Sequence, residues 1–395
     1  MNKGRVIILI ILLLIFLAVI LPFILNIVGI NVLQYGSSVG DAVTSSASLI
    51  RSSDGGVTWK NASVSESRTS FPRTIFDITI HPTNPDVMFL GAKSSGLWKS
   101  TNAGVSWTKV IDAGRALSQT ADVYRVGISH SSTTVMYVAA FQGRRGRVLK
   151  SEDGGVSFRE MYFVPSDGYV ISDVYVDPID SNHIRSITGQ GGVLDSRDGG
   201  RTWRVVKWFS EPLTKLIINP DFFSEEFVMT GRGKLFKTFD AGENWAELSG
   251  LKSAPGYSLE NPAVSEEGRT ITVTPFQFRG FSGFGTASIE ALVADVTNFA
   301  RLYIGATDGL YRSTDGGFMW DRLSVLIPSD ALPVTAVATH PGNPQIIFAG
   351  ARNQLHWSTD GGTNWAVETL PTSSRILGLS IHPTKPEVMF SVLGR

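Results

Sequence analysis

An eight-residue pattern, Ser/Thr-x-Asp-Gly/Ala-Gly-x-x-Trp, recurs seven times along this chain of 395 residues, and we refer to it as the Asp box. One copy has Asn102 in place of the Asp, and another has Phe158 in place of the Trp. An Asp or Asn that opens a turn accepts hydrogen bonds from backbone N–H groups two or three residues later. The glycines adopt positive φ at little steric cost. We therefore expect seven tight turns between strands, each followed by a large ring packed against a neighbouring unit. The turn positions are Asp54, Asn102, Asp153, Asp198, Asp240, Asp315 and Asp360, and the ring positions are Trp59, Trp107, Phe158, Trp203, Trp245, Trp320 and Trp365.

Seven equivalent turns are typical of an architecture rather than of an active site, so we interpret the boxed acids as structural. The alternative is that they bind calcium or perform acid–base chemistry. Three His-Pro turns also look tempting as metal sites, at His81, His340 and His382. They occupy equivalent positions in different repeats and so cannot converge on one metal. We expect no metal, no cofactor and no catalytic residue.

The spacing of the boxes predicts the blades of a β-propeller. Consecutive boxed positions lie 42 to 51 residues apart, except for one interval of 75 residues, and a four-stranded blade takes about 40–50 residues. In one complete repeat we expect strands at 75–80, 87–91, 97–100 and 107–110, because β-branched residues alternate there between Pro- and Gly-rich connections.

The two ends of the chain complete each other. Residues 375–395 contain the first two strands of a repeat, and residues 48–60 contain the last two with their box. Joining them removes the exposed sheet edges that favour aggregation. The sequence therefore predicts an all-β, seven-bladed β-propeller over residues 48–395, closed by pairing of N- and C-terminal strands.

An apolar segment precedes the propeller. Residues 6–28 are apolar apart from Pro22 and Asn26, and this length spans a hydrocarbon core of about 30 Å as a helix. Lys3 and Arg5 come before it, which places residues 1–5 in the cytoplasm and the propeller on the extracytoplasmic side. We expect a retained single-pass transmembrane helix in the cytoplasmic membrane, followed by a flexible linker at 29–47. A cleaved signal peptide and a secreted protein are the alternative.

The long interval holds an insertion at about residues 249–287, with an aromatic and Gly-rich tract. Exposed phenylalanines in a loop mark a contact with a partner or a membrane. They can equally fold back onto the propeller. The candidate contact residues are Phe278, Phe281 and Phe284.

Composition and motifs restrict the chemistry. Formal net charge is zero, which gives no electrostatic reason to expect nucleic acid. There is no cysteine, and no phosphate-loop, zinc-protease or serine-hydrolase motif occurs. The enzymatic alternative is a carboxylate-dependent glycoside hydrolase of sialidase-like type, which needs two carboxyl groups about 5–10 Å apart. Nothing in the sequence selects a pair among the candidates Glu66, Asp112, Asp122, Asp167, Glu211 and Asp330.

The loops between second and third strands are rich in basic residues. We expect these loops to surround the mouth of the central channel, on the face opposite the box turns. Converging positive charge favours an anionic ligand or an acidic peptide, and the guanidinium group suits carboxylate and phosphate. The alternative is that these side chains only solvate loop tips. Apart from Gln190 and the acidic Asp308, the mouth positions are Lys93, Arg144, Arg145, Arg147, Arg232, Lys234, Arg352 and Arg395.

These features resemble the Asp-box, or bacterial-neuraminidase-repeat, propellers of the photosystem II stability and assembly factor family. The resemblance covers residues 48–395 and rests on the repeats that begin at Ser313 and Ser358 and on the basic mouth. It implies a seven-bladed, non-enzymatic, exported propeller that acts as an assembly chaperone and holds a membrane-protein precursor through an arginine-rich patch.

The Asp box is less specific for that family than for the fold. Sialidases, sortilin-type receptors and xyloglucanases share it, but sortilin-type receptors have ten blades and xyloglucanases have two tandem propellers. Two features depart from the assembly-factor pattern: bacterial members are commonly lipoproteins, whereas this chain lacks cysteine, and the insertion at 249–287 is additional. We expect a membrane-anchored binding or scaffolding module for a protein partner; a purely structural envelope protein is a third hypothesis.

Overall fold

The computed structural model describes residues 47–67, 69–248 and 287–394. The predicted membrane segment at 6–28 lies outside these residues, as do nearly all of the linker at 29–47 and of the insertion at 249–287. The described part of the chain contains no helix with the length and apolar character needed to cross a membrane.

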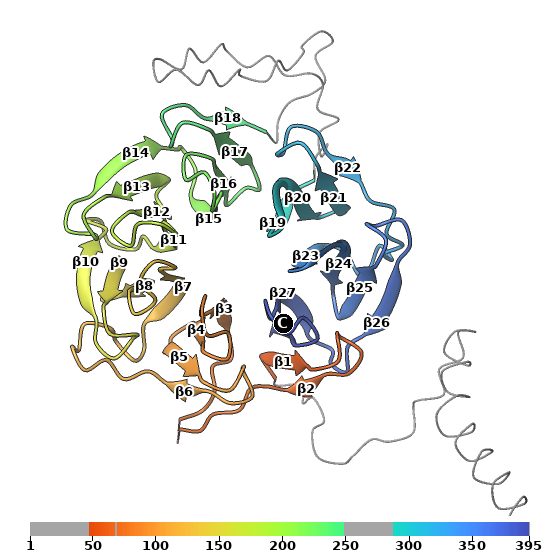
Figure 1. Ribbon diagram of the computed structural model, residues 1–395, viewed down its shortest axis with the longest axis horizontal. Helices are drawn as coiled ribbons and strands as arrows, with labels where there is room; N and C mark the ends of the chain where they lie inside the picture. The colour runs from red at the N-terminus through yellow and green to blue at the C-terminus, as the bar shows by residue number, and fades with distance from the viewer. Residues whose placement is uncertain (1–46, 68, 249–286, 395) are drawn as a thin grey trace, which may run out of the picture. The chain divides into compact units, whose positions relative to one another are not determined.

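Seven four-stranded antiparallel sheets are arranged in a ring (Figure 1). We number the blades along the chain and give their strands from the innermost outward. Blade 1 contains β3 (Ile75–Ile80), β4 (Met88–Ala92), β5 (Gly96–Ser100) and β6 (Thr108–Lys109). Blade 2 contains β7 (Asp122–Ile128), β8 (Met136–Gln142), β9 (Arg145–Ser151) and β10 (Arg159–Phe163). Blade 3 contains β11 (Ile171–Val176), β12 (Ile184–Thr188), β13 (Gly192–Ser196) and β14 (Arg204–Trp208).

The remaining blades follow the same order. Blade 4 contains β15 (Leu213–Ile218), β16 (Glu226–Thr230), β17 (Leu235–Thr238) and β18 (Ala246–Glu247). Blade 5 contains β19 (Ile289–Asp295), β20 (Asn298–Ala306), β21 (Gly309–Ser313) and β22 (Asp321–Arg322). Blade 6 contains β23 (Val334–His340), β24 (Asn343–Ala351), β25 (Gln354–Ser358) and β26 (Ala366–Thr369).

Blade 7 closes the ring from both ends of the chain. Its strands are β27 (Arg375–Ile381), β28 (Met389–Gly394), β1 (Leu49–Ser52) and β2 (Lys60–Asn61). The strand β1 pairs antiparallel with β28 in the register Leu49↔Val392 to Ser52↔Met389. This is the closure that the sequence predicted, and it gives the expected seven-bladed, all-β propeller.

The hydrophobic core consists of layers between neighbouring blades. One layer combines Phe89 and Leu97 of blade 1 with Val123, Val138 and Phe158 of blade 2. The second strand of blade 1, β4, is buried along its whole length, as expected for a strand covered on both faces. Because each blade buries apolar surface against two neighbours, all seven are needed to complete the core.

The turn that begins at Ser313 illustrates the geometry of the boxes. The Ser313 hydroxyl donates to Asp315 Oδ1 over 2.8 Å and accepts the Gly317 N–H over 2.8 Å. Asp315 Oδ1 also accepts the Met319 N–H over 2.9 Å. The Trp320 indole N–H donates to the Gly317 carbonyl over 2.9 Å, so the tryptophan ring is hydrogen-bonded to its own box turn.

Two faces of the propeller follow from the antiparallel order of the strands. The loops from second to third strands and the connections from fourth strands to the next blade emerge at one end, which we call the mouth face. The box turns and the turns from first to second strands emerge at the other end, which we call the box face.

Candidate binding site at the mouth of the propeller

Seven of the sequence-predicted basic residues lie at the mouth-face end of the second and third strands. Arg145 and Arg147 are on β9, and the other five lie in the turns that connect second to third strands: Lys93, Arg144, Arg232, Lys234 and Arg352. Arg395 and the three phenylalanines of the insertion, Phe278, Phe281 and Phe284, lie outside the described residues and stay predictions.

The arginines of blade 2 are paired with acids. Arg145 Nε lies 2.7 Å from Asp167 Oδ1, and Arg144 Nε lies 3.3 Å from Asp167 Oδ2. The hydrogen bond from Arg145 holds the pKa of Asp167 below its usual value. Arg147 forms an ion pair with Glu160 of β10. Arg144 nevertheless keeps 84% of its side chain exposed, so its charge is available to a ligand.

Blades 4 and 6 pair their cations in the same way. Lys234 Nζ lies 3.7 Å from Glu211 Oε1 and 3.5 Å from Glu247 Oε1. Arg352 NH1 lies 3.0 Å from Asp330 Oδ2. Most of these acids come from the connections between blades, which share the mouth face with the basic loops.

The mouth is therefore less basic than a count over the loops between second and third strands suggests. Lys93 and Arg232 are exposed, and neither forms an ion pair within the described residues. Among the described basic residues of the loops between second and third strands, these two have no ionic partner, and Arg144 is the most exposed of those that do.

The carboxylates proposed for glycoside hydrolysis are all engaged. Asp112 Oδ1 accepts the N–H groups of Gly114 and Phe158 over 2.7 and 2.9 Å. Glu66 accepts hydroxyl groups of Ser106 and Thr108, beside the box turn of blade 1.

The other four candidates are also held. Asp122 accepts the Ser94 N–H over 2.6 Å, and Glu211 accepts the Thr230 hydroxyl over 2.8 Å. Asp167 and Asp330 bind arginines. No two of the six candidates, all of which are described, share a hydrogen-bond partner.

Four charged residues that the sequence reasoning missed lie on consecutive inner strands. Each comes directly after the register shift of its own inner strand: Asp77 on β3, Arg125 on β7, Asp173 on β11 and Lys215 on β15. Arg125 NH1 lies 2.7 Å from Asp77 Oδ1, and Arg125 Nε lies 3.5 Å from Asp173 Oδ1. The negative charge of Asp77, followed by that of Asp173, raises the pKa of Arg125.

The two aspartates also join neighbouring blades. Asp77 Oδ2 accepts the Val126 N–H over 3.1 Å, and Asp173 Oδ2 accepts the Leu216 N–H over 3.1 Å. These amides lie on the channel-facing edges of the next inner strands, where no further strand can accept their hydrogen bonds. Each carboxylate therefore accepts a backbone N–H group that would otherwise lack an acceptor in the sheet. The aspartates are thus structural, and they hold Arg125 in place between them.

Lys215 completes this charged arc. Burial and the positive charge of Arg125 lower its pKa. At the equivalent positions of blades 5, 6 and 7 stand Ala291, Ala336 and Gly378. One side of the ring of inner strands is therefore charged at this level, and the other side has only small side chains.

An apolar arc lies one residue nearer the mouth on three adjacent inner strands. Phe76 of β3 stacks on Tyr124 of β7, with ring centroids 4.7 Å apart and planes 7° apart. Leu377 of β27 occupies the equivalent position of blade 7. Phe76 and Leu377 are 38% and 45% exposed. Apolar and aromatic groups exposed together, beside charged groups, are typical of a surface that contacts a partner.

No protein-family model matches the chain, and no curated protein matches it. Solved structures do. The GH74 xyloglucanase from Xanthomonas campestris is 17% identical with a TM-score of 0.60, over 81% of this chain and 50% of that one. The chain thus spans about half the length of that enzyme.

Two structures of YCF48, a photosystem II assembly factor, are matched over nearly their whole length. YCF48 bound to D1 peptide is 14% identical with a TM-score of 0.56, over 82% of this chain and 94% of that one. YCF48 from Cyanidioschyzon merolae is 12% identical with a TM-score of 0.59, over 81% and 95%. The fold is that of a seven-bladed β-propeller. The resemblance to assembly-factor propellers therefore holds at the level of the fold.

Proposed function

We propose that this propeller is a binding module that holds an extended segment of a protein partner against its mouth face. The observation that carries the proposal is the apolar arc on three adjacent blades, formed by the exposed Leu377 and Phe76 and the half-buried Tyr124. Aromatic side chains and arginines are the residues that most often dominate binding at protein interfaces. The arc lies beside Arg125, which two aspartates hold in a fixed position.

The accessible positive charges at the mouth favour a partner segment that is acidic. Lys93 and Arg232 have no ionic partner among the described residues, and Arg144 is mostly exposed. These cations favour a segment that carries carboxylates, and they accelerate its approach more than they tighten its binding. Arg145, Arg147, Lys234 and Arg352 are bound to acids, so their contribution to a ligand is smaller.

Three considerations support a protein partner over a hydrolytic role. The carboxylates proposed for hydrolysis are already engaged, and Asp167 has a lowered pKa, which does not suit a general acid at neutral pH. A propeller of the same fold, YCF48, has been solved bound to a D1 peptide. The apolar arc also gives an extended peptide a place for its side chains.

We further propose that residues 6–28 are retained as a membrane anchor and place the propeller on the extracytoplasmic side. The length of this apolar segment and the preceding Lys3 and Arg5 support this. Anchoring confines the search for a partner to the membrane surface, so a membrane protein in assembly is the class of partner we favour.

The test is a crosslinking pull-down of the full chain from membranes. We compare wild type with Phe76→Ser/Tyr124→Ser, and use Val205→Ser/Val367→Ser as the control because these valines are 56% and 53% exposed on outer strands. We expect at least a tenfold loss of partner in the first variant and none in the control. Equal recovery in all three proteins, or no partner with wild type, contradicts the proposal.

A further inference from the structure

A repeated contact joins the blades on the box face. The residue immediately before each box is a cation in five blades, and in four of these it donates to a box carbonyl of the next blade. The bonds run from Arg51 to Ala103, Lys99 to Gly154, Lys237 to Gly316 and Arg312 to Gly361, over 3.1, 3.4, 2.7 and 2.7 Å. The residue opposite this cation on the neighbouring strand is aromatic. For example, Lys237 Nζ lies 4.7 Å from the centre of the Phe227 ring.

Blade 3 departs from this pattern. The residue before its box is Asp195, and Arg185 stands in the paired position of the aromatic ring. Arg185 takes over the contact with the next blade and donates to the Ala241 carbonyl over 3.1 Å. It also lies 2.6 Å from Glu226 and 3.2 Å from Asp195. Arg185, Asp195 and Glu226 have side chains that are fully buried.

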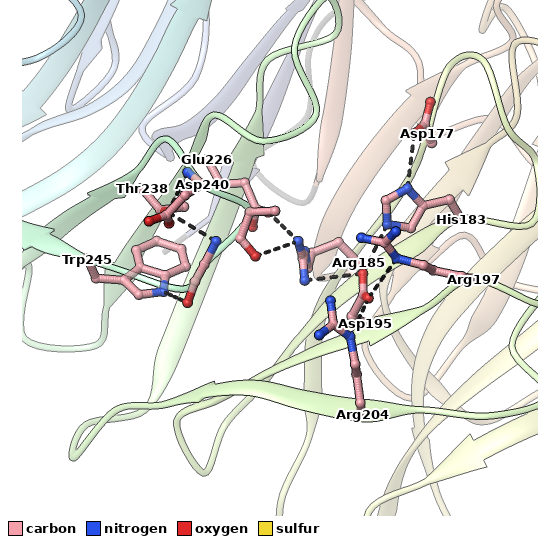
Figure 2. A network of polar contacts seen from close by, with 12 residues as sticks. Asp177, His183, Arg185, Asp195, Arg197, Arg204, Glu226, Thr238, Asp240 and Trp245 are labelled. Carbon is pink, nitrogen blue, oxygen red and sulfur yellow. Dashed lines mark hydrogen bonds and ion pairs between the residues drawn. The ribbon is translucent and has the colours of Figure 1, made fainter. Parts of the chain in front are cut away.

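Asp195 binds two arginines at the surface as well (Figure 2). Arg204 Nε lies 2.8 Å and Arg197 Nε 3.4 Å from Asp195 Oδ2, and their side chains are 61% and 66% exposed. The other carboxylate oxygen contacts Arg185 and His183 Nε2, the latter at 3.0 Å. One buried carboxylate is therefore shared by three guanidinium groups and an imidazole.

The two surface arginines have donors to spare. Each is anchored through Nε, and within the described residues their terminal nitrogens form no hydrogen bond. Burial opposes ionisation of Asp195, but the hydrogen bond with His183, followed by the charge of Arg185 and the hydrogen bond from Arg204, lowers its pKa. The carboxylate therefore stays ionised and keeps both guanidinium groups in place at all ordinary pH values.

Other acids nearby are committed elsewhere. Asp177 binds His183 Nδ1 and the amides of its own turn, and Asp198 binds its own box. Glu152 of blade 2 pairs with Lys150 and Arg159. None of these forms an ion pair with Arg197 or Arg204. Within the described residues, Asp195 is thus the one acid that forms ion pairs with the two arginines.

We propose that Arg197 and Arg204 form a binding site on the box face for a tetrahedral oxyanion, which is a phosphate or a phosphate ester. Planar guanidinium groups bind phosphate oxygens in a bidentate manner. Fixing both groups on Asp195 in advance lowers the entropy lost on binding. The site is independent of the mouth face, so it stands or falls separately from the proposed protein-binding function.

Isothermal titration of the full chain with inorganic phosphate tests the site. We compare wild type with Arg197→Gln/Arg204→Gln, which removes both groups, and with Arg197→Lys/Arg204→Lys, which keeps the charge but not the bidentate geometry. The control Arg73→Gln/Arg375→Gln removes the same charge from exposed positions that belong to neither proposed site. We expect binding at least tenfold weaker in the Gln variant, about threefold or more weaker in the Lys variant, and unchanged in the control.

A second titration uses glycerophosphoglycerol, a soluble phosphodiester, to distinguish the sources of the anion. Tighter binding of the diester assigns a lipid headgroup, and tighter binding of inorganic phosphate assigns free phosphate; either result supports the site. Should the Gln variant fail to fold, the Lys variant decides. Absence of binding of both anions to wild type, or equal affinities in wild type and the Lys variant, overturns the proposal.

Discussion

Replacing Glu226 by Gln should remove a pH-dependent cost from the junction of blades 3 and 4. Glu226 is fully buried, and it receives the Arg185 NH2 donor at Oε1 over 2.6 Å. Its other oxygen, Oε2, has no hydrogen-bond partner in the described part of the chain. Burial raises the pKa of Glu226 to about 7, against the opposing pull of Arg185. Gln keeps the acceptor for Arg185 but cannot ionise.

The sign of the effect follows from proton binding. Between the unfolded pKa of 4.5 and the folded pKa of about 7, the folded chain binds more protons at Glu226 than the unfolded chain does. The unfolding free energy therefore falls as pH rises through this window and levels off above it. A shift of this size corresponds to about 3 kcal/mol. Any pH-independent cost of the amide cancels when the difference between variant and wild type is compared across pH.

Guanidinium unfolding followed by tryptophan fluorescence measures this difference. Relative to wild type, Glu226→Gln should gain about 2.5 kcal/mol of unfolding free energy between pH 5 and pH 8. Glu290→Gln, at an exposed inner-strand position, should follow wild type. Parallel pH profiles for Glu226→Gln and wild type would refute the reasoning.

Three further predictions concern the joints between blades. Gly104→Val should lower the unfolding free energy by about 2–3 kcal/mol in denaturant titrations, because Gly104 has φ of 72° and a Cβ there would clash with the ring of Phe390. Lys237→Met should lower the unfolding free energy by about 2–4 kcal/mol, since it removes the ionic partner of Glu225 at 2.7 Å; Lys237→Arg should recover part of the loss. Deleting residues 375–395 should abolish cooperative thermal unfolding, because it removes two strands of the closing blade.

The repeat made the fold predictable from the sequence. The expected first strand of blade 1 at 75–80 coincides with β3 (Ile75–Ile80). The closing blade was predictable because its two halves, at opposite ends of the chain, each lack what the other supplies. Both inferences rest on positions that recur in every blade.

The charge of the mouth was predictable only in part. Basic residues cluster in short turns whose place in the repeat is clear. Their partners, such as Asp167 and Asp330, lie in connections that have no repeating pattern. The sequence therefore gave no means of deciding which acid approaches which cation.

The charged arc of the inner strands escaped prediction for another reason. Asp77 and Arg125 occupy equivalent positions only because each inner strand contains a register shift, and such a shift leaves no mark in an alternating pattern. The acid at position 195 is visible in the sequence, because a cation stands immediately before the box in five other blades. Comparing that one position between repeats would have revealed it.

Site-specific photocrosslinking tests the central claim, that the mouth face binds a protein segment, most directly. A photoreactive amino acid at Tyr124 lies in the apolar arc, and the same group at Met319, which is 58% exposed in a box turn, lies on the opposite face. The claim predicts an adduct with a second protein from position 124 and none from position 319. Adducts from position 319 alone, or from neither position, would contradict it.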